Sequence, residues 1–341
     1  PDRRPPVLAA RSPGANAVSA APQDAAPNEV AEATQRIRDS HRRSGEGWRG
    51  MLAALSRSRR GQVGLVLLVL FAIMAIFGHL LAPQDPNAAS SFSTSAAQSL
   101  ASPSSAHWLG TDESGRDVLS ELLYAAPITL TVGLAAALIS TLLGTFVGII
   151  AGYFGGWLDR LLMAFDDWVL VLPFIPTAIV IASLLGNRAA NWPLGRESVL
   201  VIVIGGLGWA GTSRIVRSQV LTLRERDYIS RARVLGSPDR TIMLRHILPG
   251  VIPLVLANAV LYVSVSVLAE TTLSFLGLGD TNNFSWGAML NDAYSAGAMS
   301  DGKWAYYVPP GVCVTLLALA FSLSGNALEE IVNPSSRRER G

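Results

Sequence analysis

The sequence has little of what soluble domains and catalytic sites are built from. Charged residues make up only 15% of the 341 residues, whereas soluble domains usually carry about 25%. Its single cysteine, Cys313, excludes an internal disulfide framework, and no zinc-ligand spacing is present. Its single lysine, Lys303, leaves arginine to carry almost all positive charge, and the formal net charge of +2 provides no global basic field for nucleic acid.

Long apolar segments are what the sequence does contain. Half of the residues (50%) are hydrophobic and the mean hydropathy is +0.36. A helix of about 20 apolar residues crosses a hydrocarbon core of about 30 Å. The sequence therefore predicts an all-α integral membrane protein with six transmembrane helices, at residues 63–81, 128–151, 161–185, 198–215, 247–268 and 308–328.

The regions outside these spans differ in composition. Residues 1–46 are rich in proline, alanine and charge, which predicts a disordered extension. Residues 47–62 carry Trp48, Met51 and Leu55 at helical spacing among arginines, which favours an amphipathic helix on the membrane surface over a simple basic flank. Residues 63–106 are expected to form the first span and a flexible external loop. The transmembrane domain follows at 107–334, and a short tail at 335–341.

The arginines predict the orientation of the chain, because basic residues favour the cytoplasmic side. Residues 82–107 contain no basic Lys or Arg, and residues 270–306 contain only Lys303. The pair Arg188 and Arg196 is a small exception on the external side. Arginines are concentrated before the first span, between the fourth and fifth spans and in the tail, so both termini and the loop between the fourth and fifth spans are expected in the cytoplasm. These arginines are Arg57, Arg59, Arg60, Arg214, Arg217, Arg224, Arg226, Arg231, Arg233, Arg240, Arg245, Arg337, Arg338 and Arg340.

The basic segment 228–249 predicts a rigid helix–turn–helix between two spans. A short helix can start at Arg231, and Gly236 permits a tight turn. Ser237 followed by Pro238 is typical of a helix start, with the serine as the cap. A second helix would then run from Asp239 into the membrane. Such an element can transmit the movement of a partner, although an ordinary cytoplasmic loop is the alternative.

The same segment resembles the EAA signature of binding-protein-dependent permeases. The run ARVLG at 232–236, followed by ILP at 247–249, is similar to that motif, and RHILP at 245–249 to its dipeptide, oligopeptide and nickel branch. Ser230 stands in place of the family's glutamate, and Arg231 in place of its first alanine. The resemblance implies an ATPase-coupling loop at 224–246 that uses Ser230, Arg231, Ala232, Arg233, Leu235, Gly236, Ser237, Asp239, His246 and Pro249.

Two further runs resemble the permeases of the DppC/OppC type. HWLGTDESGRDVLS at 107–120 is similar to an LGTDxxGRDVLS motif, with Trp108 where proline is usual, and LSFLGLG at 273–279 with SWGAML at 285–290 is similar to a second one. Asp112 can cap a helix that starts at Glu113. Packing of the external rim is favoured over solute contact for Arg116 and Asp117. The other external residues of the two family motifs are Gly110, Thr111, Asp112, Gly115, Gly277, Gly279, Trp286 and Gly287.

The resemblance implies the fold and partners of a type I (MetI-like) ABC importer permease in the bacterial cytoplasmic membrane. Such a chain pairs with a second permease of the DppB/OppB type. One or two ABC ATPase subunits of the DppD/DppF type bind ATP and Mg²⁺, and a solute-binding lipoprotein delivers the solute. The chain itself is then not an enzyme and is expected to hold no cofactor and no metal. Di- and oligopeptides are the expected solutes, with nickel chelates or haem as alternatives.

Few charged residues interrupt the spans, which argues against a self-powered secondary transporter or channel, the competing function. Such carriers use ionisable groups near the membrane midplane. Asp166 and Asp167, near Arg160, are expected to anchor the interface or to pair helices, and Glu270 ends the fifth span. An intramembrane enzyme would need a nucleophile and a base, and no such pair stands out. Pro173 and Pro176 are possible helix hinges or static kinks.

Overall fold

The computed structural model describes residues 58–86, 99–186, 195–280 and 283–332, with side chains up to residue 330. The predictions for residues 1–46 and 335–341, and most of the amphipathic helix predicted at 47–62, lie outside these ranges. Within them the chain is helical, apart from loops and one isolated bridge between Thr111 and Asp117. This confirms the predicted all-α class.

Five helices are long and apolar enough to cross a membrane, or six if one bent pair counts as a single span. The five are α3 (Arg59–Leu81), α4 (Val118–Phe154), α7 (Gly195–Arg224), α10 (Leu248–Phe275, continuous with the preceding turns from Asp239) and α12 (Trp304–Val332). The bent pair is α5 (Gly156–Val171) and α6 (Phe174–Gly186), which meet at 90°.

The third span, predicted at 161–185 with possible hinges or kinks at Pro173 and Pro176, is divided into two helices in the structure. The helix ends at Val171, and Leu172 has an extended backbone with ψ of 129°. Pro173 is the reason, because proline lacks an amide donor and disfavours helical backbone in the residue before it. Pro176 lies in the first turn of α6, where a missing amide donor costs nothing. Of the two possible hinges, Pro173 is therefore the one at the bend.

A stripe of small residues brings α4 and α7 into the most extensive helix pairing of the fold. Gly144, Gly148 and Gly152 follow one another at intervals of four on α4. A Cβ on Gly148 would lie 2.5 Å from the carbonyl oxygen of Ser213, and one on Gly144 would lie 2.5 Å from that of Trp209. Only glycine permits this approach, which is a common way to pack helices in membranes.

The remaining long helices surround this seam. α10 packs on α4, α7 and α12, and α3 lies against α12 and α4. α3 is the least buried of the five, with only 17% of its most apolar window inside the protein. Its outward leucines and valines, such as Val66 and Leu80, are 68% and 70% exposed. Contact with lipid explains such an apolar outer surface. A helix suits this environment because its backbone groups hydrogen-bond to one another.

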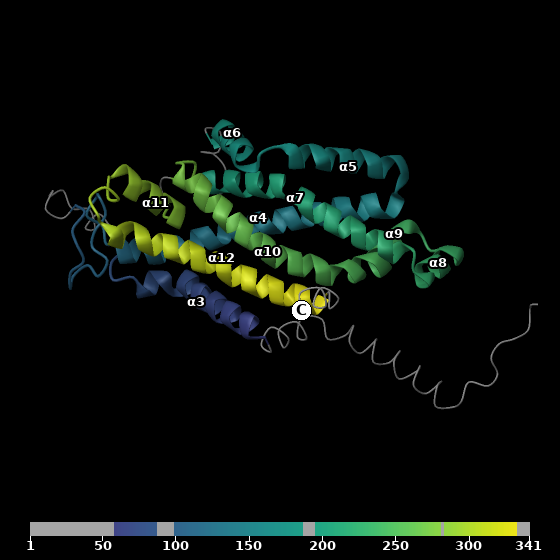
Figure 1. The fold of residues 1–341 in the computed structure, drawn as a ribbon, viewed down its shortest axis with the longest axis horizontal. Coiled ribbons are helices and arrows are strands. Elements are labelled where there is room, and N and C mark those ends of the chain that lie inside the picture. The colour runs from purple at the N-terminus through teal and green to yellow at the C-terminus, as the bar shows by residue number, and fades with distance from the viewer. Residues whose placement is uncertain (1–57, 87–98, 187–194, 281–282, 333–341) are drawn as a thin grey trace, which may run out of the picture. The chain divides into compact units, whose positions relative to one another are not determined.

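Two regions at opposite ends of the bundle contain the sequence motifs (Figure 1). One is the arginine-rich connector (residues 224–246), which holds α8 (Asp227–Val234), α9 (Asp239–Ile242) and most of a π-helical turn, η3 (Met243–Ile247). The other is the rim (residues 99–117), which lies near α11 (Trp286–Ser295) and precedes α4.

Candidate functional site: the arginine-rich connector and the rim

The base of the connector is packed into the helix bundle by three isoleucines. Ile229, Ile242 and Ile247 are each 0% exposed. They form one cluster with Val216 and Val220 of α7, together with Tyr153 and Val251. Ile229 comes from α8, Ile242 from α9, and Ile247 directly follows the connector. This cluster therefore packs both arms of the helix–turn–helix against the end of α7.

The turn between the two arms is a Schellman motif centred on Gly236. The amide of Ser237 donates to the carbonyl of Ala232 at 3.1 Å, and that of Gly236 donates to Arg233 at 3.0 Å. Gly236 has φ of +79°, a conformation that side chains disfavour. The amide of Ser237 thus helps to end α8. The predicted Ser237 cap is wrong: α9 begins at Asp239 with Pro238 at the cap position and no side-chain cap bond.

The outer tip of the connector is apolar and open to its surroundings. Val234 is 88% exposed and Leu235 is 83% exposed, among the highest values of any large hydrophobic residue in the described ranges. A Cβ on Gly236 would meet no atom within 4 Å. An apolar tip of this kind, surrounded by charged residues, is typical of a surface that another protein covers.

Tyr153, at the end of α4, ties the connector to the bundle from the other side. Its hydroxyl donates to Asp239 Oδ1 at 2.5 Å, and the guanidinium of Arg233 lies 5.8 Å from the centre of its ring. Ser230 lines a polar cleft of about 400 Å³ beside these residues. His246, from the π turn, lies with its ring 6.3 Å from that of Tyr228. Pro249 is exposed in the first turn of α10.

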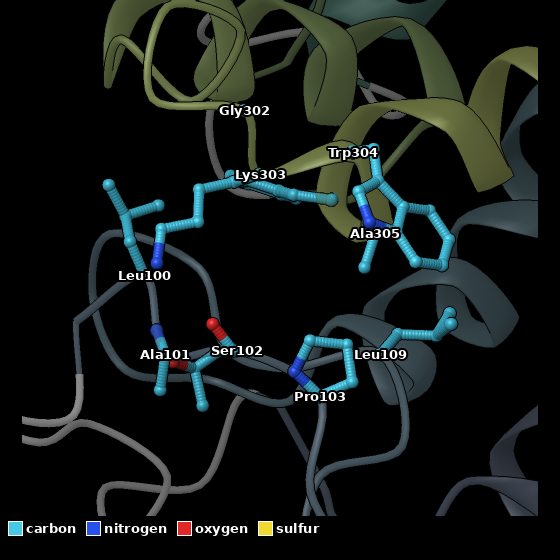
Figure 2. A pocket seen from close by; sticks show the side chains of 11 residues that line it. Leu100, Ala101, Ser102, Pro103, Leu109, Gly302, Lys303, Trp304 and Ala305 are labelled. Atoms are coloured by element: carbon cyan, nitrogen blue, oxygen red, sulfur yellow. Dashed lines mark hydrogen bonds between the residues drawn. The ribbon is translucent and has the colours of Figure 1, made fainter.

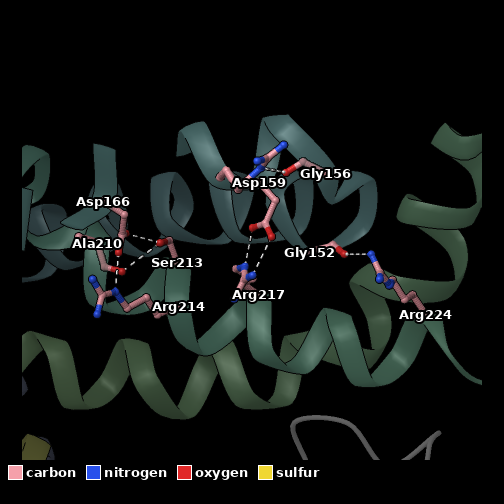
Figure 3. A network of polar contacts seen from close by, with 10 residues as sticks. Gly152, Gly156, Asp159, Asp166, Ala210, Ser213, Arg214, Arg217 and Arg224 are labelled. Atoms are coloured by element: carbon pink, nitrogen blue, oxygen red, sulfur yellow. Dashed lines mark hydrogen bonds and ion pairs between the residues drawn. The ribbon is translucent and has the colours of Figure 1, made fainter. Parts of the chain in front are cut away.

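A row of ion pairs fastens α5 to α7 next to the connector (Figure 3). Arg217 binds Asp159 through two nitrogens, at 2.5 and 2.7 Å. Arg214 Nε lies 2.6 Å from Asp166 Oδ2 and its Nη2 also pairs with Asp167. Asp166 is 0% exposed. The prediction that Asp166 and Asp167 pair helices is confirmed, but their partner is Arg214 and not the nearby Arg160.

A groove with a mixed polar and apolar lining runs between α7, α10 and α12. It measures about 480 Å³ and is lined by Arg214, Ser218, Gln219, Asn258 and Glu329, with Ile215, Leu254, Ala257 and Leu261. Asn258 donates to Thr212 Oγ1 at 2.9 Å, which joins α10 to α7 at one edge of the groove. Side chains of this polarity are unusual on helices that are otherwise apolar, and they mark a surface that does not face lipid tails.

The rim is built around buried charges that satisfy one another. Asp112 is 0% exposed. It accepts from the amide of Ser114 at 2.9 Å and from that of Arg116 at 2.7 Å. The guanidinium of Arg116 contacts Asp112 at 2.6 Å and Glu121 at 2.9 Å. Burial opposes the charge of Arg116, but Glu121 and Asp112 outweigh it and raise the pKa of the guanidinium.

Asp117, and not Asp112, caps the helix that follows the rim. Its Oδ2 accepts from the amide of Ser120 at 2.9 Å, and α4 starts at Val118. Its other oxygen lies 3.0 Å from His107 Nδ1. The prediction of a helix from Glu113 with Asp112 as its cap is therefore wrong. The carboxylate of Asp112 is instead used within a tight turn that Gly110 and Gly115 allow with φ of +80° and +83°.

The described end of the external loop, residues 99–106, is hydrogen-bonded to the later part of the rim and is not a flexible linker. The amide of Leu100 donates to Asp112 O at 2.9 Å, and that of Ala101 donates to Thr111 Oγ1 at 2.9 Å. Figure 2 shows the small cavity that this loop forms with the residues around Lys303 and Trp304. Its volume of about 60 Å³ is too small for a peptide and suits a few water molecules.

The second sequence motif fixes α11 beside the rim. Trp286 is 0% exposed and its indole donates to Leu122 O at 3.0 Å. Gly287 lies so near α10 that a Cβ would come within 2.6 Å of Thr271 O. Gly277 has φ of +79° where α10 ends, and Gly279 packs against Ser274. The serine also donates to the buried carboxylate of Glu270 at 2.8 Å. These are packing roles, as the sequence favoured for the rim.

Known protein families and related sequences agree with this arrangement. Residues 144–338 match the family described as "Binding-protein-dependent transport system inner membrane component", and residues 47–103 match the "N-terminal TM domain of oligopeptide transport permease C". The glutathione transport system permease protein GsiD of Shigella flexneri is 34% identical over 84% of this chain and 90% of its own length, and that of Escherichia coli O6:K15:H31 is 32% identical over the same shares.

The chain therefore belongs to the binding-protein-dependent permeases of ABC importers, in the branch of the DppC/OppC type. It is a multi-pass protein of the bacterial inner membrane and a transport subunit, not an enzyme. Membership of this family implies ATPase and solute-binding partners.

Several residues of the connector and its surroundings were missed from the sequence. Tyr153 and Asp239 lie 86 residues apart, so nothing local indicated their hydrogen bond. Val234 was quoted only as part of a motif, although it is the most exposed residue of the tip. Gly144, Gly148 and Gly152 recur every four residues in the sequence, and this spacing could have predicted the close contact of two helices.

Proposed function

We propose that this permease subunit imports peptides by alternating access, and that the arginine-rich connector couples it to ATPase subunits in the cytoplasm. The connector then lies inside the cell with both chain ends, and the rim lies outside. The concentration of arginine near the connector supports this orientation. A second permease of the same class completes the channel, as the resemblance to permeases of the DppC/OppC type implies.

One observation carries the coupling role. The connector combines a base that is packed against α7 and α10 through Ile229, Ile242 and Ile247 with a tip at Val234 and Leu235 that nothing in the described chain covers. A partner that grips the tip can therefore move two membrane helices together. The resemblance of this segment to the EAA motif supports the same role.

The peptide assignment is supported by one family model and one relative. The family model for residues 47–103 is named for an oligopeptide permease, and the 34% identical relative is named for transport of glutathione, which is a tripeptide. The groove beside Arg214, Gln219 and Asn258 offers both donors and acceptors for peptide groups. Nickel chelates or haem would be the alternative solutes.

Replacement of Leu235 tests the coupling. In proteoliposomes that contain the complex purified from its native membrane, Leu235→Glu should abolish the stimulation of ATPase activity by solute-loaded binding protein and the uptake of labelled di- and tripeptides. Leu235→Met keeps an apolar tip and should retain both. Full activity in the Leu235→Glu complex would disprove the coupling role.

The same proteoliposomes distinguish the competing function. A self-powered carrier would move solute when this chain is reconstituted without ATPase subunits, whereas a coupled permease should show no uptake under those conditions. Uptake of nickel chelates or haem without uptake of peptides would replace the peptide assignment and leave the coupling role intact.

A further inference from the structure

The arginines at this end of the molecule fall into two groups. Those of α7 are satisfied within the chain: Arg214 and Arg217 pair with carboxylates of α5, and Arg224 donates to Gly152 O at 3.0 Å. The other arginines of the connector are exposed, and within the described ranges no carboxylate pairs with them. This second group is Arg226, Arg231, Arg233, Arg240 and Arg245.

The acidic residues of the connector do not neutralise this charge. The segment holds six arginines and three carboxylates. Glu225 is used by Arg224 at 3.2 Å, and Asp239 accepts the hydroxyl of Tyr153. Ser230, where the family motif has glutamate, adds no negative charge to the exposed side of α8. The surface around the apolar tip is therefore positively charged.

The position of this surface disfavours the membrane as its partner. Arg214 of α7 lines the same groove as Glu329 of α12. The next residue of α12, Glu330, pairs with Arg60 of α3 at 3.7 Å. These charged residues mark the inner edge of the apolar bundle. Helix α7 continues for about ten residues from Arg214 to Arg224, which is about 15 Å of helix. That exceeds the Debye length of about 8 Å at physiological salt, so lipid charges act weakly there.

We propose that the ATPase surface that receives the arginine-rich connector is an acidic groove with an apolar floor. Val234 and Leu235 would enter the floor, and Arg231 and Arg240, on the two arms of the turn, would face carboxylates at its edges. This inference rests on the coupling role proposed above and deepens it, since it specifies the chemistry of the partner surface. Charge complementarity of this kind sets association rate and partner choice.

The test measures binding of ATPase subunits, purified from the native complex, to the permease pair in nanodiscs. Affinity should fall by about tenfold or more between about 0.05 M and 0.5 M salt, as expected for exposed charge pairs. Arg231→Glu and Arg240→Glu should each weaken binding by about tenfold at low salt, and Arg231→Lys should weaken it less. The matched control is Arg59→Glu, an exposed arginine outside the connector that should leave binding unchanged.

Leu235→Glu separates failure of this inference from failure of the coupling role. Loss of binding in Leu235→Glu together with full, salt-independent binding in the arginine variants would overturn the acidic groove and leave coupling intact. Full binding in all three variants would overturn both. Unchanged ATPase binding with lost affinity for vesicles of phosphatidylcholine and phosphatidylglycerol would assign the arginines to the membrane and also overturn the proposal.

Discussion

The rim and the arginine-rich connector both concentrate charge at an end of an apolar bundle, yet they use it in opposite ways. At the rim, Asp112 and Asp117 are 0% and 1% exposed and each has partners within the chain. In the connector, the arginines around Leu235 are exposed and have no carboxylate partner in the described ranges. Charge that is internally paired builds a rigid frame, and charge that is left unpaired is available to another molecule.

The largest effect is expected from removal of the central charge of the rim. Arg116→Ala would leave Asp112 and Glu121 buried without their common partner, which should destabilise the protein by about 3–5 kcal/mol. The matched change in the connector, Arg240→Ala, removes an exposed arginine and should change stability by less than about 0.5 kcal/mol. Thermal unfolding of the purified chain in detergent measures both. Equal destabilisation by the two variants would contradict the contrast.

A smaller effect is expected at the seam between α5 and α7, where one carboxylate is buried and its neighbour is not. Asp166→Ala removes the acceptor of Ser213 and of Arg214, and should cost about 1–3 kcal/mol because two donors lose their partner. Asp167 is 66% exposed on its side chain, so Asp167→Ala should cost clearly less. Unfolding in a denaturing detergent compares the two variants, and the interpretation is wrong if Asp167→Ala is the more harmful.

The smallest effect concerns the pH dependence of the rim end. Burial, and then the charge of Glu113, raise the pKa of Asp292 from 3.8 to about 6. A raised pKa means that the folded protein binds this proton more tightly than the unfolded chain does. The contribution of Asp292 to stability is therefore largest below about pH 4 and decreases as the pH rises through about 6.

Asp292→Asn removes this titration. At about pH 7.5 it should raise stability by about 1 kcal/mol after allowance for solvent screening, and at about pH 4 it should change little. The melting temperature across this pH range measures the effect. Asp301→Asn, an exposed aspartate near α11, serves as the control. A pH profile of Asp292→Asn that parallels the wild type would show that another group titrates there.

How much of this could be predicted from the sequence depends on the distance over which each feature is determined. The long apolar runs located all five of the described helices that are long enough to cross a membrane, because length and hydropathy are local properties. The turn at Gly236 was also predicted from the sequence, since its positive φ is a conformation that favours glycine. The sequence allowed a kink at Pro173 within the third span, but the division into two helices that meet at 90° was not predicted.

Features set by tertiary contacts were not accessible in the same way. Asp166 pairs with Arg214 across 48 residues, and the nearer Arg160 bonds to its own helix at Gly156 O. For Asp166, proximity in sequence was a poor guide to proximity in space. Asp112 carries the residue type of a helix cap, yet the partly buried guanidinium of Arg116, only four residues away, holds it in a loop.

The π turn at the end of the connector sets the rotation of α9 relative to α10. The amide of Leu248 donates to Met243 O, five residues back, because Pro249 has no amide and its ring would crowd the carbonyl of an ordinary turn. The additional residue rotates everything before it by about 100° relative to α10. A helical wheel drawn through residues 239–275 therefore assigns the wrong side to α9, and deletion of one residue from this turn would swing the tip of the connector around the axis of α10.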